Sequence, residues 1–224
     1  MPSDTQNIPP PGLFLVLDGP DGGGKSTQIA PLASWLRAQG RIVVTCRDPG
    51  GTPLGDRLRA ILLDRQAVPF GLRSEMLLFM ASRAQLVDQI IRPALIRGEV
   101  VISDRYLLAN IIYQGHAGGL GVDKVAQVGL LAANGLLPHL TLILDVPPDL
   151  ARARVGPPRD RMEDRPASDQ ALIREGFLAA AAHPDGPPYY PAPLVLIDAS
   201  VEPDQVALRI RNEVARALAL HPRC

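Results

Sequence analysis

The chain has 224 residues, 46% of them hydrophobic, and its 23 basic and 23 acidic side chains give a formal net charge of zero. This length suits a single domain with a sizeable core. The balanced charge gives no reason to expect nucleic acid or a membrane as the main partner. The two cysteines, Cys46 and Cys224, lack metal-site spacing, so we expect a reduced protein of the cytoplasm.

The N-terminal residues 1–11 are polar and end in three prolines. They have neither the basic start nor the apolar centre of a signal peptide. No apolar run in the chain is close to the length of about 20 residues that a helix needs to span a bilayer. We expect residues 1–11 to form a disordered tail and residues 12–220 to form one domain.

The first apolar segment, Leu13–Leu17, leads into a glycine-rich sequence. Residues 19–26 read G-P-D-G-G-G-K-S, which fits the phosphate-loop pattern G-x-x-x-x-G-K-[ST], and helical spacing follows over 27–36. A strand, a glycine-rich turn and a helix in this order direct backbone N–H groups and the positive helix end at phosphate oxygens. We expect the lysine to reach the β- and γ-phosphates of a nucleotide triphosphate and the serine to hold Mg²⁺. The residues predicted to bind this nucleotide are Gly19, Asp21, Gly22, Gly23, Gly24, Lys25, Ser26 and Thr27.

The rest of the chain alternates short apolar segments with helical patterns. Strands are predicted at 41–46, 99–103, 140–146 and 194–198, and helices at 53–63, 71–97, 107–115, 122–134, 169–182 and 201–220. A further helix is expected to begin at Pro147, and Pro93 is expected to kink the long helix that contains it. Together with the first strand, these elements predict a five-stranded parallel sheet with helices on both faces. This is the three-layer α/β phosphate-loop NTPase fold.

Two arginines follow strands of the predicted sheet, where ligands of such folds bind. Arg47 comes after the second strand and Arg105 after the third. Two guanidinium groups beside a triphosphate site suit a second phosphate-bearing ligand. Alternatively, each arginine pairs with its neighbouring carboxylate, Asp48 or Asp104.

Two carboxylates near the phosphate loop are candidates for the Mg²⁺ shell. Asp104 closes the third strand and Asp18 closes the first, and this metal takes one or two carboxylates while keeping several waters. With Ser26 they make up the predicted metal site. Asp18 could instead cap a turn.

Phe79 and Arg83 lie four residues apart on the predicted long helix and so share one face. An aromatic ring can stack on a nucleobase, and a guanidinium group can hydrogen-bond to the edge of that base. The alternative is that Phe79 simply belongs to the core.

The segment 152–165 is rich in arginine and poor in apolar residues, which predicts a mobile surface lid. No basic residue lies between Gly19 and Gly24, yet phosphoryl transfer needs a cation besides Lys25 and Mg²⁺. A lid arginine would supply that cation on closing, unless the segment is only a solvated loop. The candidates are Arg154, Arg159, Arg161 and Arg165.

Five motifs in this order resemble those of the bacterial thymidylate kinase family. They are D-G-P-D-G-G-G-K-S-T-Q, R-D-P-G-G-T-P-L-G, F-M-A-S-R-A-Q, D-R-Y and Y-Q-G. The similarity extends from about Leu13 to Leu218. The resemblance implies Mg²⁺-dependent transfer of the γ-phosphoryl group of ATP to dTMP, a role in dTTP synthesis, and a homodimer built by helix packing.

Carried over residue by residue, the resemblance also implies a dTMP site. Phe79 would stack on thymine, Arg83 would bond the base edge, and Arg47 and Arg105 would hold the acceptor phosphate. The implied dTMP-binding residues are Asp21, Arg47, Leu54, Phe79, Arg83, Arg105, Asn110, Tyr113 and Gln114. The implied catalytic residues are Lys25, Arg47, Arg105 and, from the lid, Arg154, Arg159 and Arg161.

Three residues depart from the family pattern. Asp18 and Asp48 stand where the family usually has glutamate, and Ala109 replaces a frequent serine. These changes concern fine specificity and metal contact, because none of them touches the phosphate loop or the arginine pair.

Two other functional classes remain open from the residues alone. One is another phosphate-loop kinase, but a nucleoside acceptor needs a general base and no pair of phosphate-binding arginines. The other is a nucleotide-dependent switch or binding protein. A GTPase switch should carry an N-K-x-D motif, and no asparagine of this chain is followed by lysine.

Overall fold

The computed structural model describes residues 12–64, 69–155, 161–162 and 166–221. These residues build a five-stranded sheet in the order β2-β3-β1-β4-β5, with every neighbouring pair parallel. The strands are β1 (Leu13–Asp18), β2 (Val43–Arg47), β3 (Val100–Asp104), β4 (Leu140–Asp145) and β5 (Leu194–Asp198). The predicted α/β fold is therefore confirmed. The tail predicted at 1–11 lies outside the described residues.

The central strand β1 explains why the sheet needs two helical layers. All six of its residues are buried, and successive side chains of a strand point to opposite faces. Leu13, Leu15 and Leu17 belong to one apolar cluster, while Phe14 and Val16 belong to another. Each face of the sheet thus has its own core.

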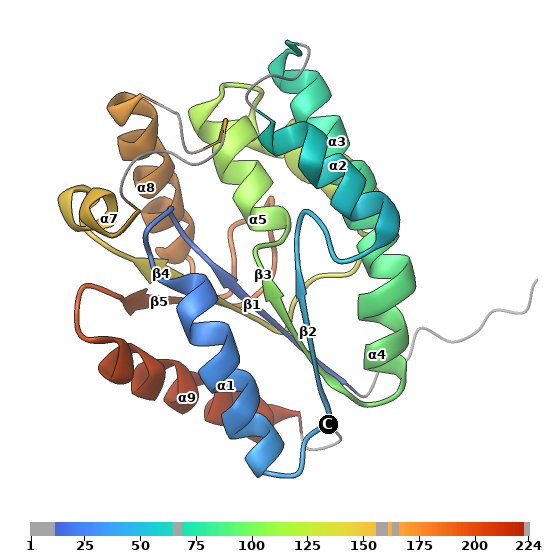
Figure 1. Cartoon of the computed structure of the whole chain (residues 1–224), viewed down its shortest axis with the longest axis vertical. Coiled ribbons are helices and arrows are strands. Elements are labelled where there is room, and N and C mark those ends of the chain that lie inside the picture. The colour runs from blue at the N-terminus through green and yellow to red at the C-terminus, as the bar shows by residue number, and fades with distance from the viewer. Residues whose placement is uncertain (1–11, 65–68, 156–160, 163–165, 222–224) are drawn as a thin grey trace, which may run out of the picture.

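Helices cover both faces (Figure 1). The helices α1 (Lys25–Ala38) and α9 (Pro203–Leu220) cover the leucine face of β1. The other helices are α2 (Pro53–Leu63), α3 (Leu72–Leu86), α4 (Arg92–Ile96), α5 (Leu107–Asn110), α6 (Val122–Ala132), α7 (Pro148–Val155) and α8 (Ala167–Ala181). Of these, α3, α5, α6 and α8 cover most of the other face, together with two π-helical segments, Val87–Ile91 and Ile111–Ala117.

The helix predicted at 71–97 is divided by a π-helical segment, η1 (Val87–Ile91), between α3 and α4. Pro93 lies in the first turn of α4, directly after this segment. Proline has no N–H group and cannot continue the regular hydrogen-bond ladder, so the wider turn accommodates it. Where the sequence predicted a kink at Pro93, the structure thus has a π-helical turn directly before that proline.

Several predicted boundaries differ from the structure by one or two residues. The second strand begins at Val43 and not at residue 41, because pairing with β3 starts there and the side chain of Ile42 is 68% exposed. The helix predicted at 107–115 continues to Ala117, since α5 passes into a second π-helical segment, η2 (Ile111–Ala117).

Parallel pairing brings the polar ends of the strands together. In the register of the sheet, Asp104 at the end of β3 is the partner of both Leu17 in β1 and Arg47 in β2. Residues that are far apart in sequence therefore meet at one edge. This edge positions the site described below.

No helix within the described parts of the chain is both long enough and apolar enough to span a membrane.

The central strand gives a direct test of the fold. Replacing the fully buried Leu15 by alanine should lower the free energy of unfolding by about 2–5 kcal/mol, because it removes apolar contacts and leaves a cavity. Urea unfolding measures this change. The matched control is Leu208→Ala on α9, where the side chain is 59% exposed and the expected change is within about 0.5 kcal/mol. Equal effects of the two substitutions would contradict the assignment of β1 as the centre of the core.

Candidate active site

The loop between β1 and α1 is shaped by glycine. Gly24 adopts a left-handed conformation with φ of 82° immediately before α1 begins at Lys25. It has no side chain with which to cap the helix, so the first N–H groups of α1 are available to an anion. Gly19 and Gly23 lie against the backbone of Leu144, where a Cβ would approach the carbonyl oxygen to 2.5 and 2.8 Å. The loop can therefore approach phosphate groups with its backbone.

Lys25 is held within this loop. Its Nζ donates hydrogen bonds to the carbonyl oxygens of Gly19 at 3.0 Å and Pro20 at 2.7 Å. Burial, assisted by the positive charge of Arg105, lowers the pKa of Lys25 to about 8. The ammonium group remains mostly protonated at neutral pH, and an anionic ligand would stabilise it further.

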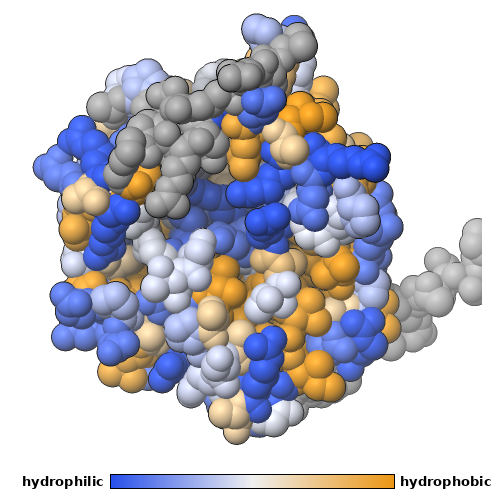
Figure 2. Space-filling model, viewed as in Figure 1, coloured by the Kyte–Doolittle hydropathy of each residue, from blue (hydrophilic) through white to orange (hydrophobic). Residues whose placement is uncertain are grey.

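A cavity of about 410 Å³ opens beside the loop. Figure 2 shows the hollowed face, with hydrophilic side chains gathered in the recess. Most of the predicted site residues line it, although they come from five separate parts of the chain. These are Asp21, Gly22, Gly24, Lys25, Ser26, Thr27, Arg47, Phe79, Asp104, Arg105, Asn110, Tyr113, Gln114 and Arg154.

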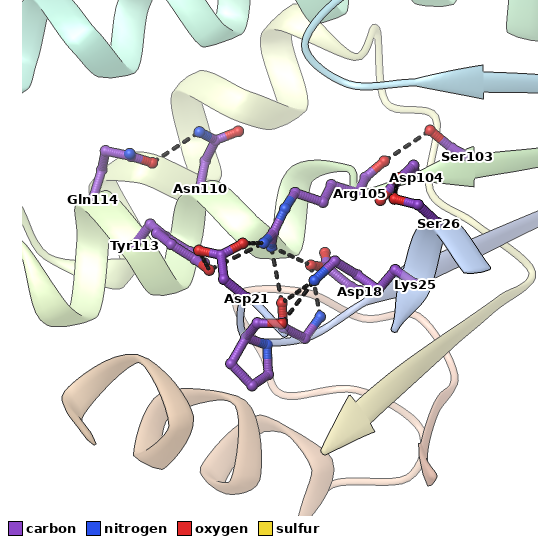
Figure 3. Close-up of polar contacts among 12 residues, drawn as sticks. Asp18, Asp21, Lys25, Ser26, Ser103, Asp104, Arg105, Asn110, Tyr113 and Gln114 are labelled. Atoms are coloured by element: carbon purple, nitrogen blue, oxygen red, sulfur yellow. Dashed lines mark hydrogen bonds and ion pairs between the residues drawn. The ribbon is translucent and has the colours of Figure 1, made fainter. Parts of the chain in front are cut away.

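Arg105 is at the centre of the polar contacts in the cavity (Figure 3). Its guanidinium group donates to the carboxylates of Asp18 and Asp21, to the carbonyl oxygen of Gly19 and to the Tyr113 hydroxyl. Its backbone has φ of 65°, which is unusual for a residue with a side chain. The neighbouring carboxylates and the Tyr113 hydroxyl outweigh the effect of burial and hold the pKa of Arg105 above its usual value. Arg105 is thus a permanent cation in the cavity wall.

Asp21 and Tyr113 are joined through the same contacts. The Tyr113 hydroxyl donates to Oδ2 of Asp21 at 3.1 Å, and its ring lies under the guanidinium carbon of Arg105 at 5.0 Å. Burial alone would raise the pKa of Asp21, but the charges of Arg105 and Lys25 prevail and lower it. Asp21 therefore remains a carboxylate at neutral pH.

Three oxygen-bearing side chains fit a Mg²⁺ ion. The Ser26 hydroxyl donates to Oδ2 of Asp104 at 2.8 Å, so both groups already lie together. Asp18 is fully buried, and its Oδ2 atom has no hydrogen-bond partner among the described residues. An unpartnered carboxylate oxygen beside a hydroxyl and a second carboxylate suits a hard cation that also binds phosphate and water. Hence Ser26, Asp104 and Asp18 are the residues that would hold the metal.

The two arginines that follow strands have different surroundings. Arg47, 56% exposed, forms an ion pair with Asp56 at 3.3 Å, whereas Arg105 pairs with Asp18 and Asp21. The described contacts join neither arginine to the adjacent carboxylate that was considered as its alternative partner. Both arginines are among the residues that line one cavity, as a phosphate-bearing ligand would require.

Phe79 and Arg83 share a face of α3 but occupy different depths. Phe79 lines the cavity and is 8% exposed. Arg83 is 1% exposed and is not among the lining residues, because its Nε donates to Asp48 at 2.6 Å and its other end donates to Asn110. Burial raises the pKa of Asp48, and the charge of Arg83 opposes that effect. Asp48 thus reaches the arginine despite being shorter than the glutamate typical of the family.

The predicted lid arginines do not behave alike. Arg154 lines the cavity and donates to the carbonyl oxygen of Ala199 at 2.8 Å. Arg161 is not among the lining residues and instead binds Glu75 and the end of α2. Arg159 and Arg165 lie outside the described residues, as does most of the segment between Arg154 and residue 166. The predicted lid motion remains a prediction.

Two further residues complete the comparison with the sequence. Leu54, predicted as a cavity wall, is 47% exposed and is not among the residues that line the cavity. Arg59 on α2 lines the cavity, although the sequence analysis did not select it. It shares a helix face with the buried Gly55 and Leu62, at spacings of four and three. A basic residue on the buried face of a helix was the signal that could have identified it.

Comparison with known protein families decides between the classes left open by the residues. The profile of the family described as thymidylate kinase matches residues 17–206 of the chain. The chain belongs to the thymidylate kinase family.

Relatives named thymidylate kinase agree over nearly the full length. The chain is 45% identical to the protein of Leifsonia xyli subsp. xyli over 204 residues, covering 90% of this chain and 93% of that protein. It is 44% identical to the Rhodopirellula baltica protein, covering 89% and 78%, and 43% identical to the Deinococcus radiodurans protein, covering 89% and 94%. The resemblance inferred from the five motifs is confirmed at the level of the thymidylate kinase family and its enzyme class.

In the thymidylate kinase site, Asp18 should make the stability of the protein depend on pH. Burial raises the pKa of this carboxyl group from 3.8 to about 6, with Arg105 and Lys25 opposing the shift. The folded state therefore binds the proton more tightly than the unfolded state. The contribution of Asp18 to the free energy of unfolding is therefore present below about pH 4 and is lost as the pH rises through about 6.

Without nucleotide or Mg²⁺, raising the pH from 4 to 7 should lower the unfolding free energy of the wild type relative to that of Asp18→Asn. The unfolding free energy of the wild type should fall by at most about 3 kcal/mol relative to the variant. Each unit of the pKa shift from 3.8 to about 6 corresponds to about 1.4 kcal/mol. Urea unfolding across this pH range measures it. Asp185→Asn, in an exposed loop, is the control, and parallel pH curves for wild type and Asp18→Asn would contradict the raised pKa.

Proposed function

We propose that this chain transfers the γ-phosphoryl group of ATP to dTMP, giving dTDP and ADP for dTTP synthesis. The observation that carries the proposal is that one cavity contains the phosphate loop, two arginines and an aromatic ring. A triphosphate donor, a phosphate-bearing acceptor and a nucleobase each find a chemically suitable partner there. The family to which the chain belongs has this activity.

On the donor side, the loop from Gly19 to Ser26 would hold ATP. Backbone N–H groups and the start of α1 would bind the phosphate oxygens, and Lys25 would leave its loop carbonyls for the β- and γ-phosphates. A Mg²⁺ ion held by Ser26, Asp104 and Asp18 would neutralise negative charge on the phosphates. We propose Mg²⁺ as the cofactor on the strength of this oxygen set.

On the acceptor side, Arg47 and Arg105 would hold the dTMP phosphate against the loop. A monophosphate is already an anionic nucleophile, so it needs positioning more than deprotonation. Phe79 would stack on thymine, and Tyr113 with Asp21 would lie against the deoxyribose. Because Arg105 is fixed by two carboxylates and a hydroxyl, the acceptor would meet an arginine already in place.

Arg154 is the arginine of the 152–165 segment that we propose as the additional cation for phosphoryl transfer. Its side chain lines the cavity that contains the phosphate loop. The hydrogen bond to the Ala199 carbonyl holds it at the edge of that cavity. On release of this hydrogen bond, the guanidinium group would be free to turn toward a transferring phosphoryl group.

We also propose that two copies of the chain form a homodimer in the cytoplasm. The neighbouring helices α2, α3 and α6 expose large apolar side chains at Ile61, Leu77 and Leu131, with exposed fractions of 46%, 54% and 82%. Covering such side chains stabilises association. Light scattering on the purified protein tests the dimer, and a single monomeric mass at micromolar concentration would contradict it.

The function is tested by ADP release with ATP and Mg²⁺ against a panel of acceptors. The panel contains dTMP, dUMP, dCMP, dGMP, UMP and thymidine. Turnover with dTMP, and weaker turnover with dUMP, is expected, because the two arginines require an acceptor phosphate and dUMP lacks only the 5-methyl group of the proposed thymine base. A preference for thymidine would instead indicate a nucleoside kinase, and ADP release that is independent of the acceptor would indicate a switch.

Lys25→Ala should lower turnover by about two to four orders of magnitude, because the ammonium group stabilises charge that develops on the transferring phosphoryl group. The chain offers a matched control, since its other lysine, Lys124, is exposed on α6. Lys124→Ala should keep the wild-type rate. Circular dichroism should show that both variants remain folded, and near-normal activity of Lys25→Ala would reject the proposed role.

Phe79→Ala should raise the KM for dTMP by about 5- to 150-fold, since stacking on a base contributes about 1–3 kcal/mol. The KM for ATP serves as the internal control and should stay within about twofold, because Phe79 is on the acceptor side of the cavity. Steady-state kinetics with each substrate varied in turn measures both constants. An unchanged KM for dTMP would reject the stacking role.

A further inference from the structure

A continuous series of side-chain hydrogen bonds connects the cavity wall to Arg161. Arg83 donates to Oδ1 of Asn110, and Nδ2 of Asn110 donates to Oε1 of Gln114 at 2.8 Å. Nε2 of Gln114 then donates to Oε1 of Glu75 at 2.8 Å, and Arg161 donates to Oε2 of Glu75 at 2.9 Å. The first four side chains are all buried. Asn110 and Gln114 line the cavity, while Arg161 lies beyond it.

The two amides in this series have a defined direction. Arg83 can only donate, so it requires the oxygen of Asn110, which turns the Asn110 NH₂ group toward Gln114. A Glu75 carboxylate accepts, so it requires the NH₂ group of Gln114. The positive end at Arg83 and the negative end at Glu75 therefore select one orientation for both amides. Reversal of either amide would place donor against donor or acceptor against acceptor at a buried site.

Arg161 is fixed by contacts that do not involve the phosphate loop. Its Nε donates to the Leu62 carbonyl at 3.1 Å, and its backbone N–H donates to the Leu63 carbonyl at 3.2 Å. Its guanidinium carbon lies 4.3 Å from the centre of the Phe70 ring. One arginine thus joins the end of α2, the start of α3 and the buried carboxylate of Glu75.

We propose that Arg161 is a positioning residue that determines nucleobase selectivity through Glu75. By holding the Glu75 carboxylate, it fixes the amide orientations of Gln114 and Asn110, and with them the pattern of donors and acceptors on the cavity wall. The inference rests on the proposed function for the identity of the acceptor. It differs from the direct role that the arginine-rich segment suggested, because Arg161 contacts Glu75, which binds Gln114 of the cavity wall, and does not contact the donor loop.

Thymine and cytosine differ in the group at position 4 of the ring, which accepts hydrogen bonds in thymine and donates them in cytosine. A wall with fixed amides distinguishes the two. When Arg161 is lost, Glu75 loses a charged partner, and the adjacent amides lose part of the field that orients them. The expected consequence is weaker binding of dTMP with less discrimination against dCMP.

The test measures dissociation constants for dTMP and dCMP by calorimetry, together with KM and kcat for dTMP. The variants are Arg161→Gln, Glu75→Gln, their double variant and Arg161→Lys. Each of the first two should weaken dTMP binding about three- to tenfold, less than the full effect of a charged hydrogen bond, because the substitution acts on the ligand only through the two amides. The preference for dTMP over dCMP should fall by a similar factor, while kcat and the KM for ATP stay within about twofold.

The double variant should be no weaker than the single variants, because both substitutions break the same connection. Arg161→Lys keeps the charge beside Glu75 and should retain part of the selectivity. The matched control is Arg216→Gln, which breaks an exposed Arg–Glu pair on α9 and should change none of these constants. A merely structural effect would reduce the active fraction and leave the dTMP preference unchanged.

Three results would overturn the proposal. A large fall in kcat with unchanged dTMP binding would make Arg161 a direct participant in phosphoryl transfer. Multiplicative effects in the double variant would show that Arg161 and Glu75 act independently, and unchanged selectivity in both single variants would remove the specificity role. Failure of the wild type to phosphorylate dTMP would instead reject the proposed function. In that case, non-additive urea midpoints for Arg161→Gln and Glu75→Gln would still support the connection, and additive midpoints would reject it.

Discussion

The site depends on the pairing of buried charges at the carboxyl ends of β1 and β3. Arg105 and Lys25 are placed close to Asp18, Asp21 and Asp104, and of these Lys25 and Asp18 are buried. Removing such charges from water is costly, and only mutual pairing and backbone hydrogen bonds compensate for it. The parallel register makes this possible, because it brings Asp104 beside β1 on one side and Arg47 on the other. The fold thus concentrates charge that an isolated loop could not hold.

A second buried pair, Asp48 with Arg83, fixes an arginine on the acceptor side of the cavity, just as the contacts of Arg105 fix that arginine on the phosphate side. Both arginines are held before any ligand binds, so little side-chain entropy is lost when the ligand arrives. The difference is exposure, since the Arg105 side chain is 18% exposed and the Arg83 side chain only 1%. Arg105 is accessible to a ligand, whereas Arg83 supports the wall against which a ligand would lie.

Much of this could be predicted from the sequence, and the limits have physical reasons. The phosphate loop, the five strands and the two arginines that follow strands depend on local spacing and on short apolar runs, which a sequence displays directly. The depth of Arg83, the direction of Arg161 and the place of Arg59 depend on partners 10 to 99 residues away. No local pattern contains that information. The π-helical turn before Pro93 was visible only as a predicted kink, because a proline shows where a helix is disturbed but not how the chain adapts.

The other π-helical segment, η2, has an evolutionary consequence. A π-helical turn corresponds to an α-helix into which one residue has been inserted, and such turns occur frequently at functional sites. Within α5 and η2, Asn110, Tyr113 and Gln114 all reach the cavity or its wall. Deleting a single residue would restore a regular helix, but it would rotate the following side chains by about 100° around the axis. Length changes in this segment should therefore be far rarer among homologues than substitutions.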